Sequence, residues 1–251
     1  MSGARRPRGV FVTGTDTGVG KTMVACSLAA WCRARGKDVA VMKPVATGGR
    51  RLRAGGEKRV VSEDALALAR AAGIREPWRL VNPVCFQEPI APWAAAQRAR
   101  RPIRLADVVA AFRTLQRRHA SVIVEGAGGL LVPLSAHETM ADLAQRLGLP
   151  LLLVARAGLG TLNHTLLSLA CARRLGLRVL GVVLNHHEPS PPGRLSAVII
   201  RTNVEALTRL AGVPVAGPLP FQPGLDARRR AAWVEAHLSR RFLEPMHGLA
   251  R

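Results

Sequence analysis

The chain has 251 residues, of which 48% are hydrophobic and 21% are charged, a composition typical of a globular domain that buries its core without disulfides. No stretch approaches the length of about 20 apolar residues that a membrane helix needs. The apolar run behind the basic N-terminus is too short for a signal peptide, so a cytoplasmic protein is expected. The net charge of +21 would suit nucleic acid, but the basic residues are scattered and aromatic residues are scarce, so nucleic-acid binding is not expected.

Short apolar segments alternate with amphipathic segments along the chain. In chain order we predict a strand at 8–13, a helix at 21–35, a strand at 39–42, a mobile loop at 47–59, a helix at 62–72 capped by Ser62, an irregular segment at 77–92, a helix at 104–118, strands at 121–125 and 149–155, a helix at 162–175, a strand at 179–185, a helix at 196–210, a strand at 214–219 and a partly helical tail at 227–251. This alternation predicts a single α/β domain over residues 1–251, with a mostly parallel sheet and helices on both faces. Such sheets bind ligands at the carboxyl ends of their strands.

The segment from Gly14 to Thr22 lies between a predicted strand and a predicted helix. It reads Gly-Thr-Asp-Thr-Gly-Val-Gly-Lys-Thr, and a strand, a glycine-rich turn and a helix are the context that a phosphate-binding loop requires. Backbone N–H groups would bind phosphate oxygens, Lys21 would face the terminal phosphates, and the Thr22 hydroxyl would bind Mg²⁺. The usual motif has glycine at position 15, whereas here Gly14 makes the loop one residue longer. The motif favours a P-loop NTPase-like fold over a chance glycine-rich turn.

Four further polar residues lie at or near strand ends. Only four of the 37 basic residues are lysine, and Lys43 is one of them, which favours a specific role over a solvated surface position. Glu125 ends an apolar strand where nucleotide triphosphatases place a Mg²⁺ ligand. Asp64 alone is more typical of a carboxylate at a helix N-terminus, and Asn185 could pair with a base but alone is more typical of a residue that starts a turn.

Several other site classes lack support in the sequence. There is no G-x-S-x-G, H-E-x-x-H or G-x-G-x-x-G motif, so serine hydrolase, zinc protease and dinucleotide-binding functions are not indicated. The four cysteines show neither a C-x-x-C pair nor nearby histidines at ligand spacing. They are predicted to be reduced thiols rather than metal ligands.

Five linked motifs resemble those of the dethiobiotin synthetase family in order and spacing. They occupy residues 13–22, 43–48, 64–68, 124–129 and 158–164, and the lengthened phosphate loop is itself a feature of the family. The resemblance covers residues 8–225 and leaves 226–251 as a poorly matched tail. It implies a homodimeric ATP-dependent cyclo-ligase of biotin biosynthesis that uses ATP and Mg²⁺.

The resemblance also implies a reaction. One amine of 7,8-diaminononanoate takes up CO₂ as a carbamate, whose oxygen attacks the γ-phosphate of ATP. The second amine then displaces phosphate from the carbamic-phosphoric anhydride and closes the ureido ring, leaving ADP and phosphate. Such a reaction needs neutralisation of phosphate charge and close positioning of the diamine.

The matched positions imply roles for individual residues. Lys21 and Lys43 would be catalytic, and Thr22, Asp64 and Glu125 would hold Mg²⁺. The nucleotide would be bound by Gly18, Val19, Gly20, Lys21, Thr22, Met23, Asp64, Glu125, Gly126, Ala127 and Gly128, and its adenine by Asn185, His186, Pro220, Phe221 and Gln222. The diamine or its carbamate would be contacted by Thr17, Thr47, Gly160, Thr161, Leu162 and Asn163, the last four across the dimer interface.

Three rival functions are weaker. A DNA-partitioning ATPase would suit the charge, but such proteins have lysine where this chain has Asp16. A non-catalytic nucleotide-binding module is disfavoured because Lys43, Asp64 and Glu125 are all present. Other ATP-dependent amide ligases of this superfamily are generally longer and carry a glutaminase domain.

Overall fold

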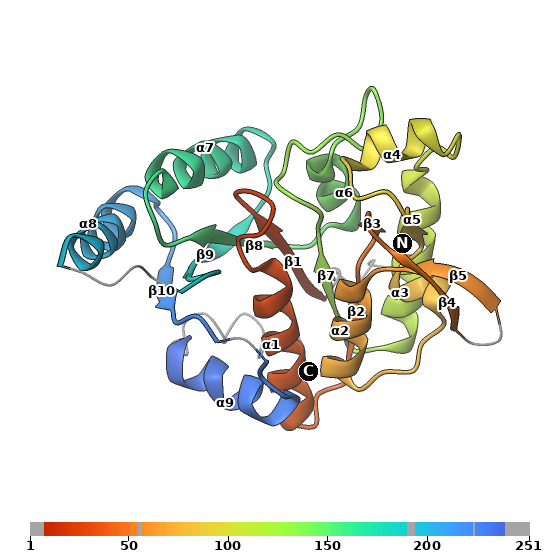
Figure 1. The fold of residues 1–251 in the computed structure, drawn as a ribbon, viewed down its shortest axis with the longest axis horizontal. Helices are drawn as coiled ribbons and strands as arrows, with labels where there is room; N and C mark the ends of the chain where they lie inside the picture. Colours follow the sequence, from red (N-terminus) through yellow and green to blue (C-terminus); the bar gives the residue numbers. More distant parts are fainter. Residues whose placement is uncertain (1–7, 55–56, 190–193, 223, 239–251) are drawn as a thin grey trace, which may run out of the picture.

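A six-stranded parallel sheet forms the centre of the computed structural model, which describes residues 8–54, 57–189, 194–222 and 224–238 (Figure 1). Its strand order is β10-β9-β8-β1-β7-β2. The strands are β1 (Gly9–Gly14), β2 (Val39–Met42), β7 (Ser121–Glu125), β8 (Leu151–Arg156), β9 (Val179–Asn185) and β10 (Val215–Leu219). Strands β1, β2 and β7 are buried along their whole length, as expected for a parallel sheet covered on both faces.

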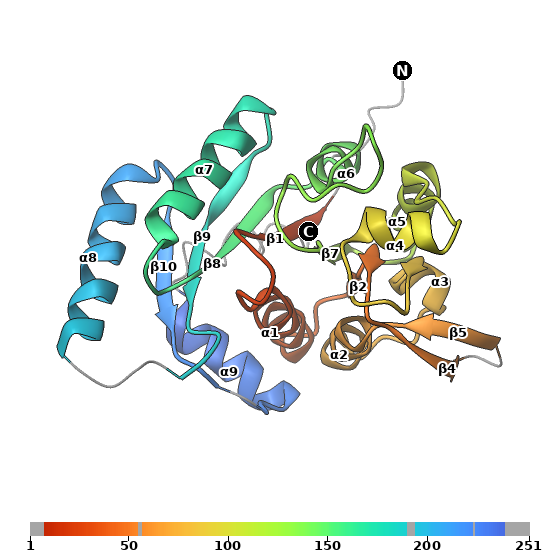
Figure 2. The same ribbon diagram turned by 45° about the horizontal axis from the view of Figure 1, so that its top comes forward.

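Helices cover both faces of this sheet (Figure 2). One core packs the sheet against α1 (Lys21–Ala34), α2 (Glu63–Ala72) and α9 (Ala227–His237). The opposite face carries α3 (Trp78–Val81), α4 (Pro92–Arg98), α5 (Leu105–Arg118), α6 (Met140–Leu147), α7 (Thr161–Arg174) and α8 (Arg194–Leu210). The predicted fold class is therefore confirmed. None of the described helices is both long and apolar enough to cross a bilayer.

Two small strand pairs lie beside the main sheet. The short strands β3 (Val45–Ala46) and β6 (Val84–Cys85) pair in parallel, and β4 (Arg50–Ala54) and β5 (Glu57–Val61) pair antiparallel. The predicted mobile loop at 47–59 is thus wrong for 50–54 and 57–59, which form strands, and its residues 55 and 56 lie outside the described part of the chain. The Arg-rich strands lack the apolar alternation that marks a half-buried strand, but their backbones pair with each other in register. The Gly-Gly dipeptide between them was the available signal of a two-residue hairpin connection.

The remaining predicted elements agree with the structure to within a few residues, with two omissions. Helices α4 and α6 were not predicted, and the segment 77–92 contains α3 and β6 as well as irregular backbone. The Ser62 cap is confirmed, because its hydroxyl accepts a hydrogen bond from Ala65 N at 3.1 Å. The tail is helical in α9, and its residues 239–251 lie outside the described part of the chain.

The strand order determines which loops meet. Strand β7 lies between β1 and β2, and in register Val12 faces Glu125 while Met42 faces Val124. The loop after β1, the end of β7 and the residue after β2 therefore share one edge of the sheet. This edge carries the candidate active site.

Candidate active site

The phosphate loop joins β1 to α1. Gly20 caps α1 with a left-handed backbone (φ 97°), and a side-chain carbon at this position would collide with the amide of Asn185. The N–H groups of the first helical turn have no partner within the helix, so they point into the loop with the positive end of the helix dipole. The loop is thus built to receive an anion.

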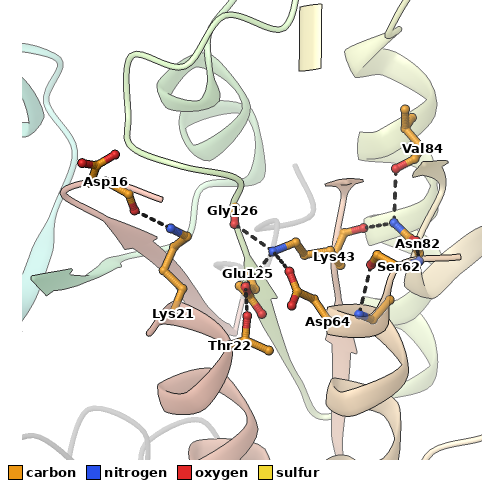
Figure 3. A network of polar contacts seen from close by, with 11 residues as sticks. Asp16, Lys21, Thr22, Lys43, Ser62, Asp64, Asn82, Val84, Glu125 and Gly126 are labelled. Atoms are coloured by element: carbon orange, nitrogen blue, oxygen red, sulfur yellow. Dashed lines mark hydrogen bonds and ion pairs between the residues drawn. The ribbon is translucent and has the colours of Figure 1, made fainter. Parts of the chain in front are cut away.

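Lys21 extends from this helix start and is largely buried, with 6% of its surface exposed. Its Nζ donates a hydrogen bond to Asp16 O at 2.7 Å, which places the ammonium inside the loop (Figure 3). Burial, together with the charge of Lys43, lowers the pKa of Lys21 from 10.5 to about 8. An anion bound in the loop would compensate for the burial of Lys21 and for the repulsion from Lys43, so the site favours a negatively charged ligand such as phosphate.

Lys43 lies between two carboxylates. Its Nζ is 2.6 Å from Glu125 Oε1 and 2.8 Å from Asp64 Oδ2, and it also donates to Gly126 O at 3.3 Å (Figure 3). Thr22 Oγ1 donates to the same Glu125 oxygen at 2.7 Å. The network therefore joins the ends of β2 and β7 to the starts of α1 and α2.

The charges of this network depend on each other. Burial raises the pKa of Glu125, which is fully buried. Burial alone would lower the pKa of Lys43, but the adjacent Glu125 and Asp64 carboxylates outweigh it and raise that pKa. Burial alone would raise the pKa of Asp64, but the adjacent Lys43 ammonium outweighs burial and lowers that pKa. Lys43 is therefore held as a cation by the two acids.

A cavity of about 690 Å³ opens over the phosphate loop and this network. It brings together eleven of the residues implied by the resemblance: Thr17, Gly18, Gly20, Lys21, Thr22, Lys43, Thr47, Asp64, Glu125, Ala127 and Gly128. The rest of the wall is formed by residues that the sequence did not indicate, namely Ala46, Pro89, Ile90, Ala91, Pro92 and Val132. One local signal was available for this region: Pro92 lies at the first position of α4, where proline is favoured, and so marks the start of the helix that borders the cavity.

The other implied nucleotide residues lie around this cavity without lining it. Val19 is buried, Met23 packs against the core, and Gly126 contributes its carbonyl to Lys43. Asn185 is buried at the end of β9, where its Nδ2 donates to Val19 O at 3.0 Å, and its Oδ1 has no partner within the described structure.

The implied adenine residues form a second group, next to Asn185. His186 N donates to Leu219 O at 3.0 Å, so the segment that continues into Pro220, Phe221 and Gln222 starts beside it. Phe221 and Gln222 are exposed, and Asn185 and His186 line a separate cavity of about 300 Å³. The structure thus brings Asn185 next to the phosphate loop, places His186 with it at the separate cavity, and leaves Phe221 and Gln222 at the surface.

The segment Gly160–Asn163 lies at the start of α7 and does not line the 690 Å³ cavity. Gly160 caps the helix, Thr161 is buried with its hydroxyl 3.4 Å from that of Thr165, and Asn163 is exposed. Within one described chain these four residues are therefore separate from the other implied substrate residues.

The oxygen ligands present fit Mg²⁺. This ion takes oxygen ligands, keeps several waters, and is held in nucleotide enzymes by one or two carboxylates plus substrate phosphates. Thr22, Asp64 and Glu125 supply a hydroxyl and two carboxylates at the cavity, and Glu125 Oε2 is buried without a hydrogen-bond partner among the described residues. These three side chains could hold the ion beside the phosphate loop.

Known proteins resemble the chain in both sequence and fold. A family model described as an AAA domain matches residues 8–229. An ATP-dependent dethiobiotin synthetase BioD of Anaeromyxobacter dehalogenans (strain 2CP-C) is 48% identical over 89% of this chain and 95% of its own length. The protein of the same name from Bacillus licheniformis is 39% identical over 85% and 86%.

Solved structures share the fold at low identity. The MinC:MinD cell division protein complex of Aquifex aeolicus aligns with a TM-score of 0.52 and 14% identity, covering 96% of this chain and 95% of that chain. This likeness concerns the fold alone and agrees with a P-loop NTPase-like architecture. With almost half of the aligned residues identical to those of a relative that it covers nearly end to end, the chain belongs to the ATP-dependent dethiobiotin synthetase family.

Proposed function

We propose that this protein is an ATP-dependent cyclo-ligase that forms dethiobiotin from 7,8-diaminononanoate and CO₂, with release of ADP and phosphate, as a step of biotin biosynthesis. The observation that carries the proposal is the meeting of two lysines, Lys21 and Lys43, with Thr22, Asp64 and Glu125 around one cavity. Phosphoryl transfer needs positive charge around the transferred group and a metal between phosphates, and this cavity offers two lysines and three oxygen side chains that could hold the metal.

The two lysines have separate roles in this account. Lys21 neutralises charge on the terminal phosphates from within the loop. Lys43 approaches from the end of β2 and stabilises charge on the carbamate and on the transferred phosphoryl group. Mg²⁺, held by Thr22, Asp64 and Glu125, supplies further neutralisation of phosphate charge when bound.

The diamine would occupy the part of the cavity beyond the phosphate loop. Thr17 and Thr47 offer hydroxyl groups there for the amines or the carbamate, and Ile90, Pro92 and Val132 offer an apolar wall suited to an alkyl chain. Both amines belong to one molecule, so ring closure is intramolecular in any case; the cavity would contribute by holding the carbamate against the γ-phosphate and the second amine in the orientation for attack.

A homodimer would complete the substrate site. Gly160–Asn163 lie at a helix start, which suits a carboxylate, yet they do not line the cavity of their own chain. Leu159 and Leu167 on the same segment are 74% and 60% exposed, which favours burial against a second copy. A cytoplasmic location is proposed because the four cysteines are free and the enzyme uses ATP.

The test is phosphate release from MgATP with and without the diamine and bicarbonate. The proposal predicts release that requires both, with a cyclic urea as product. Release without the diamine, stimulated by DNA, would instead favour a partitioning ATPase. The structure offers that rival little support. Position 16, where such proteins have lysine, is Asp16 here, and its carboxylate lies 3.3 Å from Arg156.

A further inference from the structure

Asn82 is a buried amide that no implied role includes. It follows α3, where its backbone N–H donates to Trp78 O at 2.7 Å, and only 3% of its surface is exposed. Its side chain makes three hydrogen bonds. Nδ2 donates to Lys43 O at 2.8 Å and to Val84 O at 3.2 Å, while Oδ1 accepts from Ser62 N at 3.2 Å (Figure 3).

These bonds join the two segments that carry the reactive charges. Lys43 N donates to Val81 O at 2.7 Å, so both backbone polar groups of Lys43 are bonded to the segment 81–82. Ser62 is the cap of α2, and Asp64 is the second residue of that helix. Asn82 therefore holds the backbone beneath Lys43 and the start of the helix that carries Asp64, and these two side chains meet at 2.8 Å.

No other side chain of similar size provides this pattern. The site needs a donor toward two carbonyl groups and an acceptor toward one N–H, and a carboxamide supplies both. An aspartate keeps the acceptor but places an oxygen against the two carbonyls. A buried polar group that loses its partner is costly, so the connected segments would shift to find new partners.

Resting on the proposed function for the roles of Lys43 and Asp64, we infer that Asn82 is a positioning residue of the phosphoryl-transfer centre. Asn82 does not line the 690 Å³ cavity, so it acts through Lys43 and Asp64 and not on the substrate. The phosphate loop and Lys21 have no hydrogen bond to it among the described contacts. Loss of Asn82 would thus disturb metal binding and chemistry while leaving metal-free nucleotide binding in place.

The first variant is Asn82→Asp, which preserves side-chain size, and Asn82→Ser is a second variant should the first fail to fold. Gln145→Ala is the matched control, because Gln145 Nε2 also ties two segments by donating to Leu175 O at 2.6 Å, but beside a different cavity near the start of β8. For each folded variant, calorimetry measures ADP affinity without metal and Mg²⁺ affinity in the presence of ADP. Steady-state kinetics supply kcat and KM.

The inference predicts that Mg²⁺ affinity and kcat fall by about 10-fold or more in the Asn82 variants, as for other residues that orient metal ligands. Metal-free ADP affinity should stay within about twofold, and Gln145→Ala should match the wild type. Unchanged Mg²⁺ affinity and kcat in a folded variant would overturn it, as would a parallel loss of metal-free ADP affinity. A wild type that binds MgADP but does not convert the diamine would contradict the proposed function, while the binding comparison would still decide the role of Asn82.

Discussion

Lys43 Nζ lies 2.6 Å from Glu125 Oε1, and both side chains are withdrawn from water. The lysine proposed to stabilise the transferred phosphoryl group is therefore also the counter-ion of a proposed metal ligand. Binding of Mg²⁺ by Glu125 and Asp64 would supply positive charge to these acids and free Lys43 to interact with phosphate. Stability and catalysis are thus coupled at this pair.

The first prediction concerns this pair. Lys43→Met should lower the free energy of unfolding by about 3–5 kcal/mol at neutral pH, because it leaves the buried Glu125 carboxylate unpaired. The double variant Lys43→Met/Glu125→Gln should recover part of this loss. Urea unfolding of the single and double variants measures both effects, with the exposed Lys58→Met as control. Equal destabilisation in the single and double variants would show that the ion pair is not the cause.

Lys21 is the subject of a second prediction. Lys21→Ala should lower kcat by about 100-fold or more, because the charge that faces the terminal phosphates is lost. Circular dichroism should show a retained fold, since Lys21 makes its hydrogen bond within its own loop. Lys58→Ala, in the hairpin, should leave turnover unchanged. Normal turnover in Lys21→Ala would rule out the assigned role of the phosphate loop.

A third prediction compares adjacent acids on α2. Asp64→Asn should raise the Mg²⁺ concentration needed for half-maximal activity by about 10-fold or more, and Glu125→Gln should do the same. Glu63→Gln is the control, because Glu63 pairs with Arg50 at 3.1 Å and does not line the cavity. A Mg²⁺ titration of the three variants measures the effect. Identical titrations for Asp64→Asn and Glu63→Gln would remove Asp64 from the metal site.

The lowered pKa of Lys21 gives a fourth prediction. Between pH 8 and 10.5 the unfolded chain keeps the lysine proton that the folded chain has lost. This residue therefore makes the folded state more stable as the pH rises through that range, by up to about 1.4 kcal/mol per pH unit. Cys26 and Cys32 act in the opposite direction, because burial raises the pKa of their thiols to about 12 and 11.

The difference in unfolding free energy between wild type and Lys21→Met cancels the cysteine contribution. It should shift in favour of the wild type from pH 8 to pH 10, in the absence of nucleotide and metal. A difference that does not vary with pH would mean that Lys21 keeps an ordinary pKa.

The sequence predicted the elements whose signals are local. The phosphate loop lies between a strand and a helix, and Glu125 ends an apolar strand, so both were recognisable before the strand order was known. The scarcity of lysine drew attention to Lys43, whose contact with Glu125 depends on the order β1-β7-β2. For α6, the Thr139–Asp142 capping box is a local signal in the sequence that marks the start of the helix.

Other features could not be read from local patterns. The three hydrogen bonds of Asn82 connect it to residues 43, 62 and 84, and no spacing in the sequence indicates these contacts. The hairpin β4–β5 is polar and makes its bonds through the backbone, so hydrophobic periodicity does not mark it. The wall formed by residues 89–92 depends on how an irregular segment crosses the cavity.

The most direct test of the central claim supplies bicarbonate with a carbon isotope label, together with MgATP and 7,8-diaminononanoate. The account predicts that the label appears in the carbonyl of a cyclic urea, with phosphate released in an equal amount, and that Lys43→Met loses both. Phosphate release without labelled urea would contradict it.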